Sequence, residues 1–156
     1  MNLGNIAGNN PPNFMMIGVG ANNTLFSYDL LQTTATPLLP IADGVFEMHA
    51  LYGVDNDNNG TLDAWVDPNT TTVYTLAALM AGTETASNLL QSIKAVRVGL
   101  ITRTSLPEKT AVAPATLTLF SDLGLTHTRT LTPAEQLYRY RTIESTIPIR
   151  NTMLLN

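Results

Sequence analysis

The sequence of 156 residues contains no cysteine. This absence excludes disulfides, thiolate zinc sites, iron–sulfur clusters and cysteine nucleophiles. A chain of this length is the size of one domain, and such a domain buries about 68–70% of the surface that its unfolded chain exposes. The chain therefore has enough residues to build a core without a covalent staple.

Charged residues are scarce, at 13% of the chain against a usual share of about 25%. Eight basic and twelve acidic residues give a net charge of −4. A nucleic-acid-binding protein would need a basic stripe, so no nucleic acid partner is predicted. Threonine and asparagine supply the polarity instead, as is typical of a β-rich protein that works outside the cytoplasm.

Long hydrophobic runs are also missing. The longest uncharged apolar stretch near the start covers residues 14–21, and Gly18 and Gly20 interrupt it. A membrane-spanning helix needs about 20 apolar residues. The first 13 residues have no basic n-region and no apolar h-region, so they are not a signal peptide. We expect either a protein that is soluble as made or a soluble piece of a longer one.

Motifs of common enzyme classes are absent. The sequence has no G-x-S-x-G elbow, no P-loop, no G-x-G-x-x-G and no H-E-x-x-H. Its two histidines, His49 and His127, lie far apart in the chain, and neither has a second histidine at metal-ligand spacing. Each is predicted to lie on a strand face, and the chain is predicted not to be an enzyme.

The apolar patterns predict an α+β fold in which antiparallel, hairpin-connected strands dominate. Strands are predicted at residues 25–30, 45–52, 93–104, 116–120 and 136–147, with 125–131 as a threonine-rich partner of 116–120. Pro37 and Pro40 bracket an edge or connecting segment, and Pro148 ends the last strand. Helical spacing between Leu76 and Ile93 is broken at Gly82, which predicts one or two short helices.

An acidic loop carries the strongest chemical signal. Residues 55–63, DNDNNGTLD, match the first nine positions of an EF-hand-type calcium loop. Oxygens two residues apart in a tight turn converge on one point, and Gly60 permits the sharp bend. The possible calcium ligands are the side chains of Asp55, Asp57 and Asn59, the carbonyl of Thr61, and the carboxylate of Asp63 directly or through water.

The same loop departs from a true EF-hand. Its twelfth position, where a bidentate glutamate belongs, is Val66, and no helix precedes the loop. Asp67 or Glu47 could substitute for the missing glutamate. Two interpretations stay open: a weak calcium site in the range of about 10⁻⁴–10⁻³ M, or a polar hairpin loop in which Asn, Asp and Gly supply turn conformations.

Three blocks of sequence, in order, resemble the PilW family of type IV pilus minor pilins, over residues 25–151. The first runs from PIADGV at 40–45 through ALYGVD at 50–55 to NGTLDAW at 59–65. The second is IKAVRVGL at 93–100, followed by Arg103. The third is YRYR at 138–141, then Glu144 and TIPIRN at 146–151.

The resemblance implies a pilin-like β-domain preceded by a long hydrophobic N-terminal helix. The leader peptide, peptidase site, helix and first part of the globular region have no counterpart here. We therefore expect a C-terminal soluble portion of a longer subunit. Residues 1–24 would be a flexible lead-in or a remnant of the upstream globular region, residues 25–151 the β-domain, and residues 152–156 a tail.

The function implied by the resemblance is assembly and not catalysis. Minor pilins of this kind prime pilus assembly and sit near the tip with sister pilins, which links them to adhesion and twitching motility. The implied partners are other minor pilins and the major pilin, with membrane contact only through the N-terminal helix. The implied location is the inner membrane facing the periplasm before assembly, and the extracellular pilus afterwards.

Two further expectations concern surfaces. Arg97, Arg103, Arg139 and Arg141 alternate along predicted strands and could line one sheet face, either as contacts to acids of a neighbouring subunit or as a solvated face. The alternative function is a freestanding extracellular calcium-dependent adhesin or carbohydrate-binding module. Trp65, beside the acidic loop, is the candidate for stacking on a sugar, although a core position is favoured.

Overall fold

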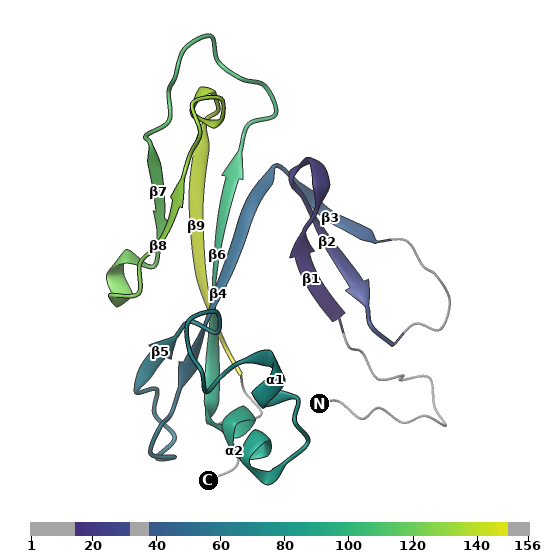
Figure 1. The fold of residues 1–156 in the computed structure, drawn as a ribbon, viewed down its shortest axis with the longest axis vertical. Coiled ribbons are helices and arrows are strands. Elements are labelled where there is room, and N and C mark those ends of the chain that lie inside the picture. The colour runs from purple at the N-terminus through teal and green to yellow at the C-terminus, as the bar shows by residue number, and fades with distance from the viewer. Residues whose placement is uncertain (1–14, 32–37, 150–156) are drawn as a thin grey trace.

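The computed structural model describes residues 15–31 and 38–149. It has nine strands, two α-helices and three 3-10 turns in these ranges (Figure 1). In chain order they are β1 (Met15–Val19), η1 (Ala21–Asn23), β2 (Thr24–Asp29), β3 (Leu39–Asp43), β4 (Val45–Val54), β5 (Ala64–Val66), α1 (Leu76–Leu79), α2 (Glu84–Ser92), β6 (Ile93–Arg103), β7 (Thr116–Leu119), η2 (Ser121–Leu123), β8 (His127–Thr130), η3 (Glu135–Leu137) and β9 (Tyr140–Pro148). The predicted strand-dominated α+β class is confirmed.

The largest sheet has four antiparallel strands in the order β5-β4-β6-β9. Its two long central strands are the segments with the clearest alternation of apolar residues, and both predictions are confirmed. In the middle of the sheet, His49 of β4 lies opposite Gly99 of β6, which in turn lies opposite Glu144 of β9. Alternate residues of each strand point to opposite faces, so these three positions share one face.

Two smaller sheets flank the large one. Strands β7 and β8 form the predicted hairpin, and β1, β2 and β3 form a three-stranded antiparallel sheet (Figure 1). Within residues 1–24, the expected lead-in or remnant of an upstream globular region, the structure places β1, which pairs with β2 across a turn. Asn22 and Asn23 make that turn in the left-handed region, with φ of 61° and 57°; asparagine tolerates this region better than most residues. Residues 1–14 lie outside the described residues.

The helical window resolves into two short helices, as predicted. The side-chain oxygens of Thr75 and Thr83 accept hydrogen bonds from the backbone N–H groups of Ala78 and Ala86, which caps both N-termini. Gly82 adopts a φ of +67° between the helices. Its left-handed conformation explains why one continuous helix does not form.

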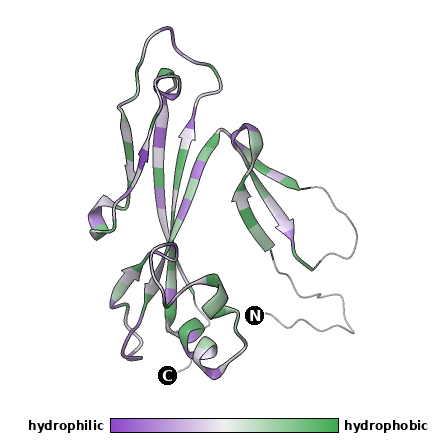
Figure 2. Cartoon of the chain, viewed as in Figure 1, coloured by the Kyte–Doolittle hydropathy of each residue, from purple (hydrophilic) through white to green (hydrophobic). Residues whose placement is uncertain are grey.

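The core divides into two clusters: in the view of Figure 1, the upper cluster lies beside the β7–β8 hairpin and the lower cluster lies beside α1 and α2. The upper cluster joins β4 and β6 to the β7–β8 hairpin through Leu51, Ile101, Leu119 and Phe120. The lower cluster joins the sheet to α1 through Val54, Tyr74, Leu79 and Ile93, and Leu89 of α2 packs against it. Apolar and polar residues alternate along the strands (Figure 2).

The last strand begins later than predicted. The sequence predicts a strand over residues 136–139, but Glu135–Leu137 form the turn η3. The cause is a capping box: the side chain of Thr132 accepts from the N–H of Glu135 at 3.2 Å, and the Glu135 carboxylate accepts from the N–H of Thr132 at 2.7 Å. Pro133, after the capping threonine, is compatible with a first helical position.

Candidate functional site

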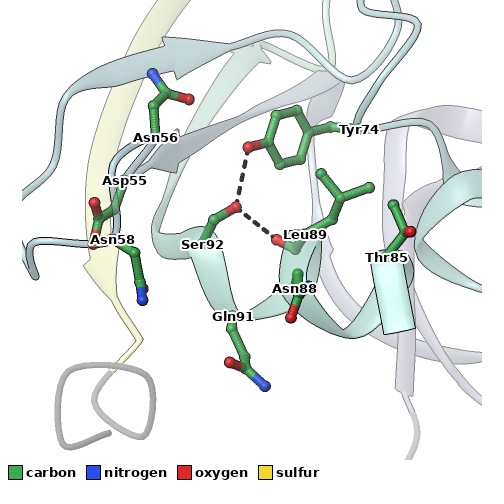
Figure 3. A pocket seen from close by; sticks show the side chains of 9 residues that line it. All are labelled: Asp55, Asn56, Asn58, Tyr74, Thr85, Asn88, Leu89, Gln91 and Ser92. Carbon is green, nitrogen blue, oxygen red and sulfur yellow. Dashed lines mark hydrogen bonds between the residues drawn. The ribbon is translucent and has the colours of Figure 1, made fainter. Parts of the chain in front are cut away.

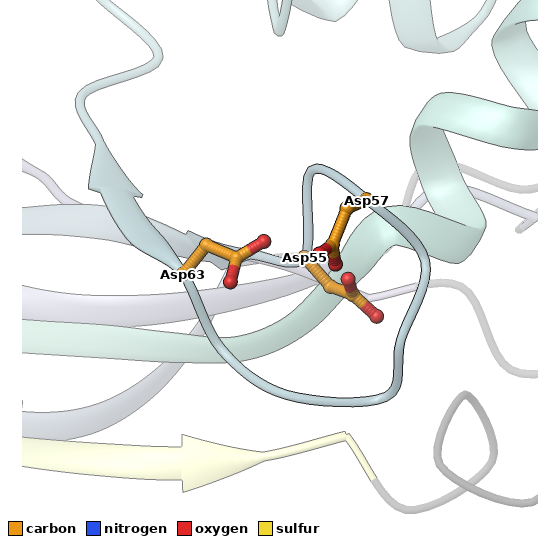
Figure 4. Close-up of side chains that lie close together, drawn as sticks. All are labelled: Asp55, Asp57 and Asp63. Atoms are coloured by element: carbon orange, nitrogen blue, oxygen red, sulfur yellow. The ribbon is translucent and has the colours of Figure 1, made fainter.

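The acidic loop connects β4 to β5. Val54 at the end of β4 lies opposite Ala64 at the start of β5, and the Asp63 N–H donates to the Val54 carbonyl at 2.9 Å. The two strands therefore fix both ends of the loop. Its three aspartates bring carboxylate oxygens within 4.8 Å of one another (Figure 4). Asp55 is buried, whereas Asp57 and Asp63 are exposed.

Backbone amides hold these carboxylates inside the loop. Asp55 accepts from the N–H groups of Asn59 at 3.1 Å and Gly60 at 2.8 Å, and Asp63 accepts from the N–H of Asn56 at 2.7 Å. Gly60 adopts a φ of +88°, which residues with a side chain rarely adopt. The loop is thus folded around the carboxylate of Asp55.

A buried lysine faces the same carboxylate. The Nζ of Lys94, on β6, lies 3.4 Å from Oδ2 of Asp55, and the two residues are only 3% and 1% exposed. Burial acts to raise the pKa of Asp55, but the amides of Gly60 and Asn59 together with the Lys94 ammonium outweigh it and hold the pKa below its ordinary value. Asp55 is therefore ionised at neutral pH and already compensated by one cation.

The other predicted ligands take different positions. The Asn59 side chain donates to the Asp57 carboxylate at 2.9 Å, and its oxygen accepts from the N–H of Thr61 at 2.8 Å. Val66 at the twelfth position lies within β5. The Asp57 and Asp63 carboxylates are the exposed acidic groups that remain to meet a cation beside Asp55.

Neither suggested substitute for the missing glutamate belongs to the cluster. Oδ2 of Asp67 lies 3.1 Å from Nε2 of His49. Burial acts to raise the pKa of Asp67, but the hydrogen bond from the Asn69 N–H and the contact with His49 outweigh it, so the pKa is lowered. Glu47 contacts His127 and Arg129 instead. Strand β4 carries Glu47 away from the loop, so the geometry offers fewer protein ligands than a complete EF-hand.

An open hollow of about 470 Å³ lies beside the loop, between it and α2 (Figure 3). Asp55 is the one charged residue of its lining, which otherwise consists of Asn56, Asn58, Tyr74, Thr85, Asn88, Leu89, Gln91 and Ser92. The Tyr74 hydroxyl is 3.0 Å from Oγ of Ser92, which donates to the Leu89 carbonyl at 2.8 Å. Trp65 does not line this hollow; it packs partly buried against the upper core cluster.

The structure brings the two histidines together, which the sequence did not predict. Their rings stack with centroids 4.1 Å apart and planes 16° from parallel. His49 comes from β4 and His127 from β8, so the stack joins the hairpin to the large sheet. The chain separation between these residues leaves no local signal that could have revealed the contact.

Comparison with known families decides the family of this chain. The family model described as type IV pilus-assembly protein W, PilW, matches residues 14–151 of this chain. The chain belongs to the PilW family. Neither a curated protein nor a solved structure gave a match. Membership assigns this PilW chain to type IV pilus assembly, and the match extends the resemblance seen in the sequence toward the N-terminus.

Among its described residues, the PilW chain has no helix with both the length and the apolar character for a membrane crossing.

The four arginines proposed as partner contacts do not line one face. Arg97 and Arg103 share a face of β6, whereas the register places Arg141 on the opposite face of the same sheet. Arg97 forms ion pairs within the chain, since its guanidinium lies 2.8 Å from carboxylate oxygens of both Glu144 and Asp122. The hydrogen bond to Glu144 and the nearby Asp122 raise the pKa of Arg97 despite its partial burial.

The other three arginines differ in their exposure and in their contacts within the chain. The guanidinium of Arg103 lies 4.3 Å from the ring centre of Tyr138. Arg139 is exposed and pairs with Glu108 at 2.8 Å. Arg141 is exposed and makes no ion pair with any residue in the described part of the chain. Arg139 and Arg141 are therefore the two arginines that a neighbouring subunit could reach.

Proposed function

We propose that this PilW chain is a non-catalytic minor pilin that primes assembly of a type IV pilus. It sits at or near the pilus tip through contacts with other minor pilins and the major pilin. The family match over residues 14–151 carries this proposal. A strand-rich, low-charge domain with exposed strand edges is compatible with a fibre subunit that must meet several neighbours.

The proposal is tested by removing the gene from its source organism. Cells without it are expected to lose surface pili and twitching motility, and expression of the full-length protein is expected to restore both. Pili that form in normal number without the gene would contradict the assembly role.

Partner contact through the exposed arginines is a more specific prediction. Reversing both charges, Arg139→Glu with Arg141→Glu, is expected to weaken binding to purified sister minor pilins by about tenfold. This corresponds to about 1.4 kcal/mol, a moderate value for close charges at an interface. Pull-down and titration measure the loss. Glu84→Lys, a charge reversal at an exposed residue of α2, is the control and should bind normally. Equal binding by all three proteins would remove the arginines from the interface.

The acidic loop supports a second property, weak calcium binding. Three carboxylates converge within 4.8 Å, and hard cations prefer such oxygen ligands. The Lys94 ammonium beside Asp55 and the missing twelfth-position ligand both reduce affinity. This property would suit either a tip subunit or the alternative role of a calcium-dependent extracellular adhesin.

Calorimetric titration with calcium is expected to give a dissociation constant of about 10⁻⁴–10⁻³ M. Asp57→Ala removes an exposed ligand and should abolish the heat. Glu84→Gln removes an acid of α2 outside the loop and should leave the titration unchanged. The absence of heat from the unaltered protein at millimolar calcium would contradict calcium binding and favour a purely structural loop.

A further inference from the structure

The outer edge of β9 lies at one end of the large sheet, and most residues of the strand are exposed. Strand β9 is the last strand of the large sheet and pairs only with β6 (Figure 1). Over residues 15–31 and 38–149, no strand pairs with its other edge. We propose that this edge accepts an extended strand from a different pilus subunit, by main-chain hydrogen bonding. The inference rests on the proposed assembly role and names the kind of contact through which it operates.

Backbone hydrogen bonds at both ends of β9 fix which backbone groups face outward. The N–H of Thr104 donates to the Arg139 carbonyl at 3.0 Å, and the N–H of Ile149 donates to the Lys94 carbonyl at 2.8 Å. Directly opposite residues in an antiparallel pair alternate between bonded and non-bonded. The odd-numbered residues of β9 therefore direct their N–H and C=O groups to β6. The even-numbered residues, Thr142, Glu144 and Thr146 among them, direct theirs away from the sheet.

The β9 edge lacks several of the devices that protect sheet edges, although it carries two charged side chains, Arg141 and Glu144, of which Glu144 is paired with Arg97. Natural edges are blunted by short length, proline, lysine or a bulge. Strand β5, at the opposite edge of the same sheet, has three residues, and β3 contains Pro40 and pairs with a register shift. Strand β9 has nine residues, pairs with β6 without a register shift, contains no lysine and reaches proline only at Pro148.

The edge is also held in place before a partner arrives. Glu144, at the centre of β9, accepts from the Arg97 guanidinium at 2.8 Å and from the N–H of Phe120 at 2.8 Å. These contacts connect β9 to its neighbouring strand and to the end of β7. A strand that is already ordered loses little conformational entropy on binding, which favours addition of a partner strand.

The side chains of β9 indicate which residue types a paired strand would carry. Ile143 and Ile147 point to one face and are 45% and 53% exposed, and Arg141 shares that face. Thr142 and Thr146 point to the other face. A complementary strand would place apolar or β-branched residues beside the isoleucines and an acidic residue near Arg141, since such cross-strand pairs stabilise sheets.

A second copy of this chain fits less well. Antiparallel pairing over the whole length of β9 would place Glu144 opposite Glu144 of the second copy, and like charges directly opposite one another are destabilising. The occupant that the edge favours is therefore a strand of another pilus subunit, with opposite charge near Arg141 and without an acid facing Glu144.

Thr142→Pro tests the proposal because it deletes an outward N–H and leaves the bonds to β6 in place. Thr142→Val is the matched control, since it changes the same side chain and keeps the N–H. A photo-cross-linking amino acid at position 146 of the full-length protein, in cells that assemble pili, reports the contact. We expect a cross-link to an extended segment of another pilus subunit, identified by mass spectrometry. Thr142→Pro should weaken it at least tenfold, and Thr142→Val should not.

The outcomes separate this proposal from the assembly role. An unchanged cross-link in Thr142→Pro, no cross-link at all, or a cross-link only to a second copy of the chain would overturn strand addition. Pili that persist without the gene would instead overturn the assembly role. Thermal unfolding of each purified variant checks its fold. If Thr142→Pro does not fold, Thr146→Pro, with the cross-linker moved to position 142, carries the same expectation and the same contradiction.

Discussion

Phe120→Ala is expected to lower the free energy of unfolding by about 3–5 kcal/mol, the usual loss when a buried phenylalanine is truncated to alanine. The Phe120 side chain is 0% exposed and belongs to the cluster that joins the β7–β8 hairpin to β4 and β6. A Cβ atom on Gly99 would lie 2.7 Å from Cζ of Phe120, so the ring rests directly on the β6 backbone.

Urea unfolding followed by circular dichroism measures the loss, with the slope of the transition checked for constancy. Leu106→Ala is the matched control, because Leu106 is 77% exposed and its truncation should change stability by no more than about 0.5 kcal/mol. A loss below about 1 kcal/mol in Phe120→Ala would mean that the hairpin does not depend on this contact. The hairpin also carries His127, so its detachment would separate the stacked histidines.

The conformation of Phe120 is a feature that local sequence patterns do not predict. The segment 116–120 was predicted as a strand from its alternation, and β7 confirms this to Leu119. Phe120 itself leaves the strand, with a φ of 60° in the left-handed region. Its N–H donates to Glu144, 24 residues later in the chain. A bulky residue adopts this conformation only when tertiary contacts impose it, and no local pattern reports such contacts.

The same distinction separates what could be predicted at the acidic loop from what could not. Residue spacing alone indicated that Asp55, Asp57 and Asp63 would converge, and their carboxylates lie together. The spacing gave no sign of Lys94, which reaches Asp55 because the bulge between Gly53 and Val54 and the pairing of β4 with β6 bring residue 94 to the base of the loop. Strand register depends on the whole sheet, so a cation supplied by another strand is invisible to a motif.

Lys94→Met is expected to lower the midpoint of thermal unfolding by about 10 °C. Removal of one partner of a buried ion pair leaves the other charge without compensation, which is more damaging than loss of an exposed pair. Arg139→Met, which breaks the exposed pair with Glu108, is the control and should shift the midpoint by no more than a few degrees. Differential scanning calorimetry at neutral pH compares both variants with the unaltered protein.

Acidification and a second substitution distinguish this electrostatic cause from simple loss of packing. Because the folded protein lowers the pKa of Asp55, its ionised carboxylate contributes stability above the unfolded pKa of about 3.9, and that contribution is lost as pH falls through the folded pKa. Without Lys94 the buried carboxylate loses its cation, so its pKa should rise and its protonation should relieve the variant. The difference in unfolding midpoint between Lys94→Met and the unaltered protein should therefore shrink as pH is lowered toward 4. Asp55→Asn, added to the Lys94→Met variant, should recover part of the lost midpoint at neutral pH. A deficit that is constant with pH and unaffected by Asp55→Asn would assign the loss to packing of the lysine side chain.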